Sequence, residues 1–257
     1  MLFRAVNNIN IVIRNCRLNT VRSLSMAKPV LYGDEVSPPA RFVMMTADIL
    51  DIDLDFQKID LFKRENRTES YKKINPLQKI PALSHNGTNI CDSHAIALYL
   101  CQLKNDQNLY PEDPIQRAKV NQLLFFNSGT LFPLDSELLS KYFMKSWPVD
   151  NEKIEEWYRA LDFLEHHLQD HKWLTGEKMH LCDISLVTVV TSTSALVPLT
   201  KRHTKVEQWI KNFENLPFYE INKNGVSILS ARRATHWGSP GGLQLLLLSL
   251  ALALCLG

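Results

Sequence analysis

The chain has 257 residues, of which 45% are hydrophobic and 22% are charged, so it is long enough to form a substantial core. Its net charge of +2 comes from the first 28 residues, which hold five basic residues and no acid; the slightly acidic remainder argues against a nucleic-acid-binding surface. The five cysteines are scattered without a C-x-x-C pair, which argues against a zinc site and a disulfide framework, and we expect no metal.

Residues 1–27 form an extension that carries arginines, contains no acid and includes many Ile, Val and Leu residues. This composition is that of a mitochondrial transit peptide, which would place the protein in mitochondria. The alternative is an upstream extension of the coding sequence, because Met26 stands just before the first strand pattern and is a suitable start. In that case we expect a cytoplasmic protein.

Residues 28–103 alternate between strand and helix patterns and form the first predicted domain. Strands are expected at 30–32, 54–58, 80–84 and 89–91, and helices at 37–50, 63–73 and 95–103. Asn86-Gly87 is the sequence of a two-residue hairpin turn between the last two strands. The order β-α-β-α-β-β-α predicts a thioredoxin-like domain.

Residues 104–113 are polar and form a predicted linker, whereas residues 114–233 show only helical patterns and form a second domain. Helices are expected at 115–132, 135–146, 151–170, 183–195, 204–214 and 217–230. Pro133 should kink the first of them or restart the chain in a new helix. The predicted fold class is therefore an α/β domain followed by an all-α domain.

Residues 234–257 form an apolar tail without a charged residue. Its most apolar part, residues 243–257, has 15 residues, whereas a helix that crosses a membrane needs about 20. The tail is either a short membrane anchor or an artefact of an alternative exon or of read-through. We expect a membrane as a partner only if the tail is real.

Ser37 stands at the start of the predicted helix 37–50, in front of Pro38 and Pro39. Backbone N–H groups and the positive end of the helix dipole point outward at this position, so an anion is stabilised there. A hydrogen bond from the Ser37 hydroxyl would lower the pKa of a bound thiol and stabilise its thiolate. The alternative is a serine that only caps the helix.

Two further motifs suit an extended peptide with an amino-acid head group. A cis bond between Ile80 and Pro81 would turn the backbone of Ile80 outward to pair with the peptide, and the alternative is an ordinary trans bond. Asp92 and Ser93 at the next helix start suit an ammonium and a carboxylate group, although both are also common caps. The order and spacing of the three motifs together favour a site for a thiol peptide.

The stretches LYGDEVSPPAR, INPLQKIPALSHNG and DSHAIALYL resemble the N-terminal domain of insect glutathione transferases of the delta and epsilon classes. The resemblance continues into the helical half, through LCDIS, and covers about 205 of the 257 residues. It implies the cytosolic glutathione transferase fold, a thioredoxin-like domain followed by an all-helical domain, with glutathione as co-substrate. DSHAI together with FPLDSELLS further resembles an epsilon-like type of insect steroidogenic tissue.

The resemblance implies a role for each matching residue. Ser37 looks like the catalytic serine that stabilises the thiolate, and the backbone of Ile80, before Pro81, would bind the cysteinyl part of glutathione. The other implied glutathione contacts are Asp92 and Ser93 for the γ-glutamyl end, Asn66 and Gln78 near the glycine carboxylate, and His94 beside the site. Asn66 is shorter than the His or Gln that is common in the family.

Asp183 matches the buried aspartate with which the family caps a helix, and it should accept a hydrogen bond from the preceding loop. His180 stands where the family has Ser or Thr. Imidazole is a poorer cap, which would cost about 1 kcal/mol of stability. We expect this motif to serve folding and not catalysis.

Asp135 is an acid in an apolar run that follows Pro133. One interpretation is an N-cap that restarts the helix and places Leu138 and Leu139 on its buried face. The other is a carboxylate at the end of an apolar pocket, which accepts a hydrogen bond from a ligand hydroxyl; the resemblance favours a sterol or steroid. The further candidate contacts of the second substrate, all of which could equally belong to the core, are Pro38, Leu61, Phe62, Leu131 and Phe132.

The leading hypothesis for function is an enzyme that activates glutathione for reaction with an apolar, steroid-like substrate in insect ecdysteroid biosynthesis. Two alternatives stay open, a glutathione-dependent sterol carrier without catalysis and a general detoxifying transferase. The resemblance also implies a homodimer. The expected partners are therefore glutathione, an apolar small molecule and a second copy of the chain.

Overall fold

The computed structural model describes residues 27–143 and 151–236 of the chain. The predicted transit peptide and nearly all of the apolar tail lie outside the described residues. Within the described ranges no helix combines the length and the apolar character that crossing a membrane requires.

The N-terminal half contains a four-stranded sheet in the order β2-β1-β3-β4. Its elements are β1 (Val30–Gly33), α2 (Pro38–Ile49), β2 (Asp55–Lys58), the 3-10 turn η1 (Glu65–Arg67), α3 (Glu69–Ile74), β3 (Ala82–His85), β4 (Thr88–Cys91) and α4 (Ser93–Leu103). β1 pairs with β2 in parallel, and the other two pairs are antiparallel. This confirms the predicted thioredoxin-like order. The helix predicted at 63–73 is divided into η1 and α3, because Thr68 caps α3 through its side chain.

The turn between β3 and β4 has the geometry that its sequence predicts. Asn86 has a φ of 49° and Gly87 a φ of 78°. A two-residue turn with positive φ at both positions matches the twist of the two strands, and Asn-Gly is the pair that tolerates it best. The hairpin thus sets the register of β3 against β4, which leads the chain into α4.

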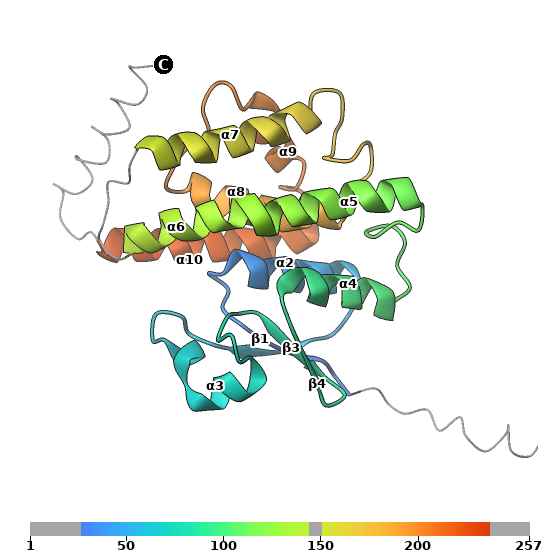
Figure 1. Ribbon diagram of the computed structural model, residues 1–257, viewed down its shortest axis with the longest axis vertical. Helices are drawn as coiled ribbons and strands as arrows, with labels where there is room; N and C mark the ends of the chain where they lie inside the picture. The colour runs from blue at the N-terminus through green and yellow to red at the C-terminus, as the bar shows by residue number, and fades with distance from the viewer. Residues whose placement is uncertain (1–26, 144–150, 237–257) are drawn as a thin grey trace, which may run out of the picture.

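The C-terminal half is helical over the described residues. Its elements are α5 (Pro114–Phe126), the π-helical turn η2 (Asn127–Leu131), α6 (Phe132–Phe143), α7 (Asn151–His167), α8 (Leu181–Ser194), α9 (Thr204–Lys211), the 3-10 turn η3 (Pro217–Tyr219) and α10 (Glu220–His236). A new α-helix, α6, begins directly before Pro133, which matches the predicted restart, although α5, η2 and α6 follow one another without a gap and lie in line (Figure 1). Pro133 is the second residue of α6, where a missing N–H group is tolerated.

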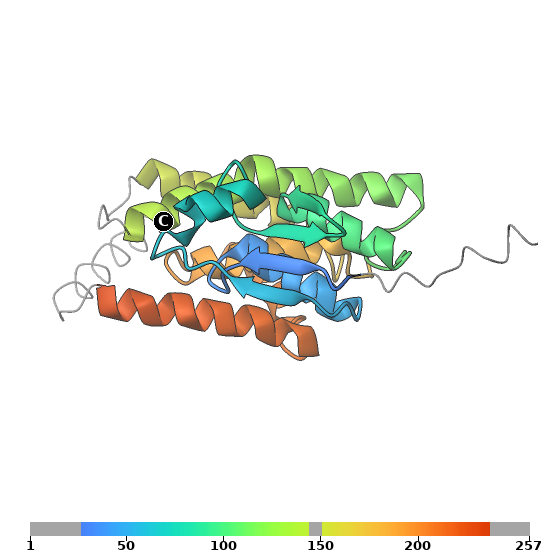
Figure 2. The same cartoon turned by 90° about the horizontal axis from the view of Figure 1, so that it is seen from below.

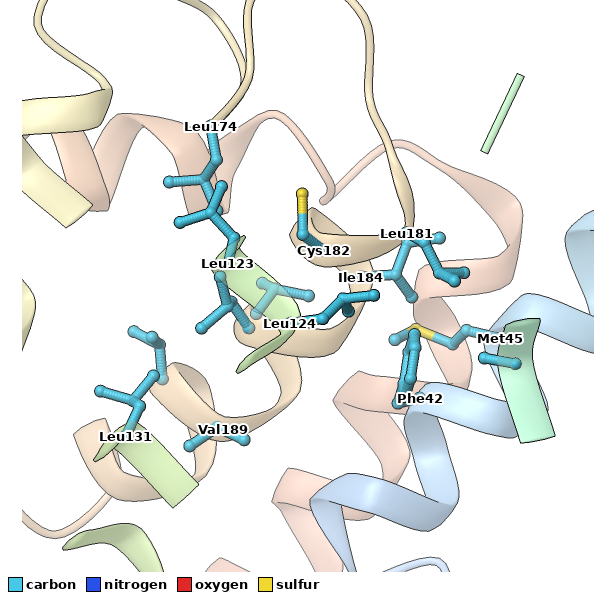
Figure 3. Packing of buried hydrophobic residues seen from close by; sticks show 14 of the residues in the cluster. Phe42, Met45, Leu123, Leu124, Leu131, Leu174, Leu181, Cys182, Ile184 and Val189 are labelled. Carbon is cyan, nitrogen blue, oxygen red and sulfur yellow. The ribbon is translucent and has the colours of Figure 1, made fainter. Parts of the chain in front are cut away.

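The two halves share one hydrophobic core. α2 packs against α4 within its own half and against α8 and α10 of the helical half. Figure 1 shows α2 and α4 between the sheet and the helical half, with α3 on the far side of the sheet. Seen from below in Figure 2, α10 lies on one side of the molecule, and α5 and α6 lie on the opposite side. Phe42 and Met45 of α2 lie beside Ile184 of α8, which packs near Leu124 of α5 (Figure 3).

Candidate functional site

Ser37 is the N-cap of α2 and its side chain makes no capping hydrogen bond. Its backbone is extended, with a φ of −80° and a ψ of 119°, and the residue is only 7% exposed. Pro38 and Pro39 occupy the first two helical positions and have no N–H groups to cap. The usual task of an N-cap side chain is therefore reduced here, which favours the interpretation of Ser37 as a ligand contact over that of a simple cap.

Asp34 shapes the loop between β1 and α2. Its carbonyl oxygen accepts a hydrogen bond from the Ser37 N–H at 2.9 Å. Its buried carboxylate accepts from the Val36 N–H at 3.3 Å and from the Leu61 N–H at 3.1 Å. This role of Asp34 is not among those predicted from the sequence, although an aspartate two residues before a turn amide is a known turn signal. Asp34 thus ties the Ser37 loop to the segment that follows β2.

The Ile80–Pro81 peptide bond is cis, the first of the two alternatives considered for it, and directly precedes β3. The residue two positions earlier, Gln78, has a φ of 55°. The structure brings Asn66 and Gln78 together, because the Asn66 side-chain amide donates to the Gln78 carbonyl oxygen at 2.9 Å. Arg67 Nη1 lies 3.5 Å from the Gln78 side-chain oxygen. The Asn66 amide thus holds the loop before Ile80.

Asp92 is the N-cap of α4 and has a φ of 103°. Its Oδ1 atom accepts from the His94 N–H at 2.9 Å and from the Ala95 N–H at 3.1 Å. The carboxylate is 58% exposed, so it caps the helix and still faces solvent. Ser93 beside it is buried. The two interpretations of this pair, cap and head-group site, are compatible.

The His94 side chain connects α4 to the helical half. Its Nε2 atom lies 2.8 Å from Ser185 Oγ on α8, which also accepts a hydrogen bond from Asn127 Nδ2 on η2 at 2.6 Å. Its ring packs against Phe42 with the centroids 5.6 Å apart. Burial lowers the pKa of His94 while the nearby Asp92 opposes this, so the imidazole is neutral near pH 7. Asn127 Oδ1 is buried and has no hydrogen-bond partner among the described residues.

Asp135 lies in the first turn of α6 and is 1% exposed. Thr193 Oγ1 of α8 donates a hydrogen bond to its Oδ1 atom at 2.6 Å. Burial raises the pKa of Asp135 to about 7, and the Thr193 hydrogen bond and the charge of Arg41 only partly oppose this. The residue is therefore within the helix and is not its N-cap, and its carboxyl group is largely desolvated.

The other candidate contacts of the second substrate differ in exposure. Leu131 is completely buried and belongs to the hydrophobic core, and the partly buried Phe132 packs against that core. Pro38 is buried, Leu61 is half-buried and Phe62 is 42% exposed. Of these five, Leu131 fits the core interpretation best, and Phe62 is the most accessible to a ligand.

Asp183 is a structural residue, as predicted. Its buried carboxylate accepts hydrogen bonds from the Leu174 N–H at 2.9 Å, the His180 N–H at 2.9 Å and Trp209 Nε1 at 3.0 Å. The first of these is the predicted bond to the preceding loop. The His180 ring lies 2.7 Å from the hydroxyl of Thr175. Burial raises the pKa of Asp183 to about 6 despite these hydrogen bonds.

No group of three or more His, Cys, Asp or Glu side chains that could hold a metal ion is found over residues 27–143 and 151–236. The cysteines of this part of the chain, Cys91, Cys101 and Cys182, are free thiols. Burial raises the pKa of each of them. They are therefore poor nucleophiles, and the chemistry of the site rests on other groups.

Two family models match the chain. The model for the glutathione S-transferase N-terminal domain matches residues 31–108, and the model for the glutathione S-transferase C-terminal domain matches residues 130–217. The chain is also similar to glutathione S-transferase 1 of Manduca sexta, with 34% identity over 74% of this chain and 89% of the relative. Glutathione S-transferase D7 of Drosophila melanogaster is 31% identical over 75% of this chain and 87% of the relative.

The chain is also similar to solved structures of glutathione transferases. An epsilon-class glutathione S-transferase from the housefly, Musca domestica, has a TM-score of 0.77 and 33% identity, over 81% of this chain and 98% of that one. A glutathione transferase homologue from Drosophila mojavensis with bound glutathione has a TM-score of 0.77 and 34% identity, over 81% of this chain and 97% of that one. The similarity covers both the sheet-containing half and the helical half.

Proposed function

The chain belongs to the glutathione S-transferase family and is a glutathione transferase, and we propose that Ser37 is the residue that activates the glutathione thiol. The observation that carries this proposal is the buried Ser37 hydroxyl at the N-terminus of α2, which makes no capping hydrogen bond. A hydroxyl donor and a helix N-terminus both favour the thiolate over the thiol. The thiol proton passes to solvent water. The thiolate then attacks an electrophilic carbon of the second substrate, so that the C–S bond forms while the bond from that carbon to its leaving group breaks and the leaving group departs with the electron pair.

The proposed glutathione contacts lie at the ends of β1, β3 and β4. The backbone of Ile80 pairs with the cysteinyl part of glutathione, while Asp92 and Ser93 at the start of α4 bind the γ-glutamyl end. The exposed carboxylate of Asp92 supports this assignment. The segment held by Asn66 and Gln78 faces the glycine end, and His94 supports the site from the side of the helical half. The bound glutathione of the Drosophila mojavensis homologue supports the choice of co-substrate.

The proposed second substrate is an apolar electrophile with one polar end, of the steroid type, handled in ecdysteroid biosynthesis. The resemblance of DSHAI and FPLDSELLS to the Noppera-bo type of insect transferase supports it, as does the desolvated carboxyl group of Asp135. A carboxyl with a pKa of about 7 accepts a hydrogen bond from a hydroxyl without carrying a full charge at neutral pH.

The proposed assembly is a homodimer, which is typical of glutathione transferases. Large apolar side chains stand exposed in both halves, with Leu77 at 72% and Phe125 at 71%, and an interface would cover them. The proposed location is the cytoplasm, unless residues 1–25 act as a transit peptide.

The Ser37→Ala variant of the full chain tests the proposed activation. We expect the pKa of the bound glutathione thiol to rise toward its value in water, about 8.5, and kcat/KM for a model electrophile to fall about 100-fold. Thiolate absorbance against pH measures the first quantity. An unchanged thiol pKa and an unchanged rate would remove Ser37 from the mechanism. Ser128→Ala, an exposed serine of η2, is the matched control.

Isothermal titration with a sterol on glutathione-loaded protein tests the second substrate. We expect saturable binding that Asp135→Ala, which removes the acceptor oxygen, weakens and that Ser128→Ala leaves unchanged. Turnover of the bound sterol then separates an enzyme from a carrier. Glutathione binding without any sterol signal would contradict the steroid proposal and leave the general detoxifying transferase as the function.

A further inference from the structure

Arg41 lies one helical turn after Ser37 on α2 and is completely buried. The backbone N–H of Arg41 donates a hydrogen bond to the Ser37 carbonyl oxygen at 3.0 Å. A guanidinium carries five N–H donors in a planar fork. Here five side-chain hydrogen bonds leave this fork, from Nε, twice from Nη1 and twice from Nη2. The charged group therefore has a complete set of partners.

The partners of Arg41 come from three separate segments. Nη1 donates to the carbonyl oxygens of Glu35 at 2.9 Å and Val36 at 2.8 Å, the two residues directly in front of Ser37. The remaining partners belong to the helical half, namely the Thr188 carbonyl oxygen at 3.2 Å and Ser192 Oγ on α8, and Asn222 Oδ1 at 2.9 Å on α10. One side chain thus connects the Ser37 loop to two helices that are far away in the sequence.

The burial of this cation is costly unless its hydrogen bonds stay in place. Desolvation lowers the pKa of Arg41 to about 10, and the nearby Asp135 and Asp34 carboxyl groups only partly oppose this. A displaced Nη1 would leave its buried N–H donors without acceptors, while Nε and Nη2 keep theirs, and buried donors of a charged group are costly to leave unpaired. The arrangement therefore resists movement of the Glu35 and Val36 backbone.

α10 fits against this loop only because residue 225 is a glycine. A Cβ atom on Gly225 would overlap Arg41 Cδ and the carbonyl oxygen of Glu35. The second contact is to backbone, so either α10 or the Ser37 loop would have to move. Figure 1 shows α10 beside α2 and α8, the two other helices of this junction. Asn222 lies one turn before Gly225 on α10 and in addition donates to Thr191 Oγ1 at 2.9 Å.

We propose that Arg41 is a positioning residue, which uses α8 and α10 to hold the Glu35–Val36 backbone and thereby the Ser37 hydroxyl in place. The inference rests on the proposed role of Ser37. It adds that the thiol chemistry of the N-terminal half depends on the last described helix, with Gly225 and Asn222 as the residues through which α10 acts.

The test compares Gly225→Ala and Asn222→Ala with Gly129→Ala, all in the full chain. Gly129 is the matched control, because a Cβ atom there meets nothing within 4 Å. We expect each α10 variant to raise the pKa of the bound glutathione thiol and to lower kcat about tenfold, with a smaller change in KM. Arg41→Lys should give the same result, since an ammonium has three donors and cannot span the three segments.

A merely structural role would lower the melting temperature of these variants but leave the thiol pKa and kcat of the folded protein as in the wild type. That outcome would overturn the proposal. Combining Gly225→Ala with Ser37→Ala supplies the second criterion. If Arg41 acts through Ser37, the double variant has the thiol pKa of Ser37→Ala alone, whereas additive shifts contradict it. An inert Ser37→Ala would instead overturn the proposed function itself.

Discussion

Thr193 Oγ1 donates a hydrogen bond to Asp135 Oδ1 over 2.6 Å, and neither residue has appreciable contact with solvent. This bond joins α8 to the first turn of α6 inside the helical half. A carboxyl group in such a place is favoured in its protonated form, and the pKa of Asp135 is accordingly raised from 3.8 to about 7. The contribution of Asp135 to the free energy of unfolding is therefore less favourable at high pH than at low pH.

The first prediction is that Asp135→Asn stabilises the folded protein at pH 8. The pKa of Asp135 is higher in the folded than in the unfolded state, so the wild type loses stability as the pH rises from about 4 to about 7. At pH 8 the raised pKa lowers the free energy of unfolding of the wild type by an amount on the order of 4 kcal/mol. Asp135→Asn removes this loss, but its buried amide N–H groups lack partners and offset part of the stabilisation. Urea unfolding at pH 5 and pH 8 measures it. A variant without a pH-dependent advantage over the wild type would contradict the desolvated carboxyl, and Glu112→Gln is the exposed control.

The second prediction concerns Asp183→Ala, which removes the acceptor of three buried N–H groups. Each buried donor left without a partner costs about 1–3 kcal/mol, so we expect a loss of roughly 3–5 kcal/mol in the free energy of unfolding. Chemical denaturation measures the loss, and Asp170→Ala at an exposed position is the control. A loss below 1 kcal/mol would show that water replaces the carboxylate. At a permissive temperature, the thiol pKa of the folded variant should equal that of the wild type.

The third prediction is that Asp34→Ala impairs catalysis. Its carboxylate accepts hydrogen bonds from the Val36 N–H inside the Ser37 loop and from the Leu61 N–H in the segment that follows β2. Without it the loop is less well placed, and we expect kcat/KM for a model electrophile to fall about tenfold. Steady-state kinetics with saturating glutathione measure this, with the exposed Asp48→Ala as the control. Kinetics equal to those of the control would show that the Arg41 contacts suffice to hold the loop.

The fourth prediction separates the hydrogen bond of His94 from its charge. The imidazole is neutral because burial lowers its pKa, so a neutral side chain that still reaches Ser185 should replace it. We expect His94→Gln to bind glutathione like the wild type and His94→Leu to bind it about fivefold more weakly, or about 1 kcal/mol. Titration calorimetry at pH 7 compares the two variants. Equal affinities of both would mean that the Ser185 bond does not support the site.

The features best predicted from the sequence are those that depend on residues close together along the chain. The Asn86-Gly87 turn follows from local backbone preference, and the strand and helix order follows from hydrophobic periodicity. The predicted bounds differ from the observed ones by a few residues, as at the π-helical turn η2, which hydrophobic periodicity does not mark although Pro133 follows it closely. The partners of Arg41 were also missed, because Asn222 lies 181 residues away and only the folded chain brings them together.

The core that spans both halves determines how the molecule comes apart. Phe42 and Met45 are buried in one continuous cluster with residues of α5 and α8, so each half covers apolar surface of the other. Cleavage of the peptide chain at 104–113 would therefore leave a nicked molecule whose fragments stay associated. For the same reason, calorimetric unfolding would follow a single transition, since neither half retains a complete interior on its own.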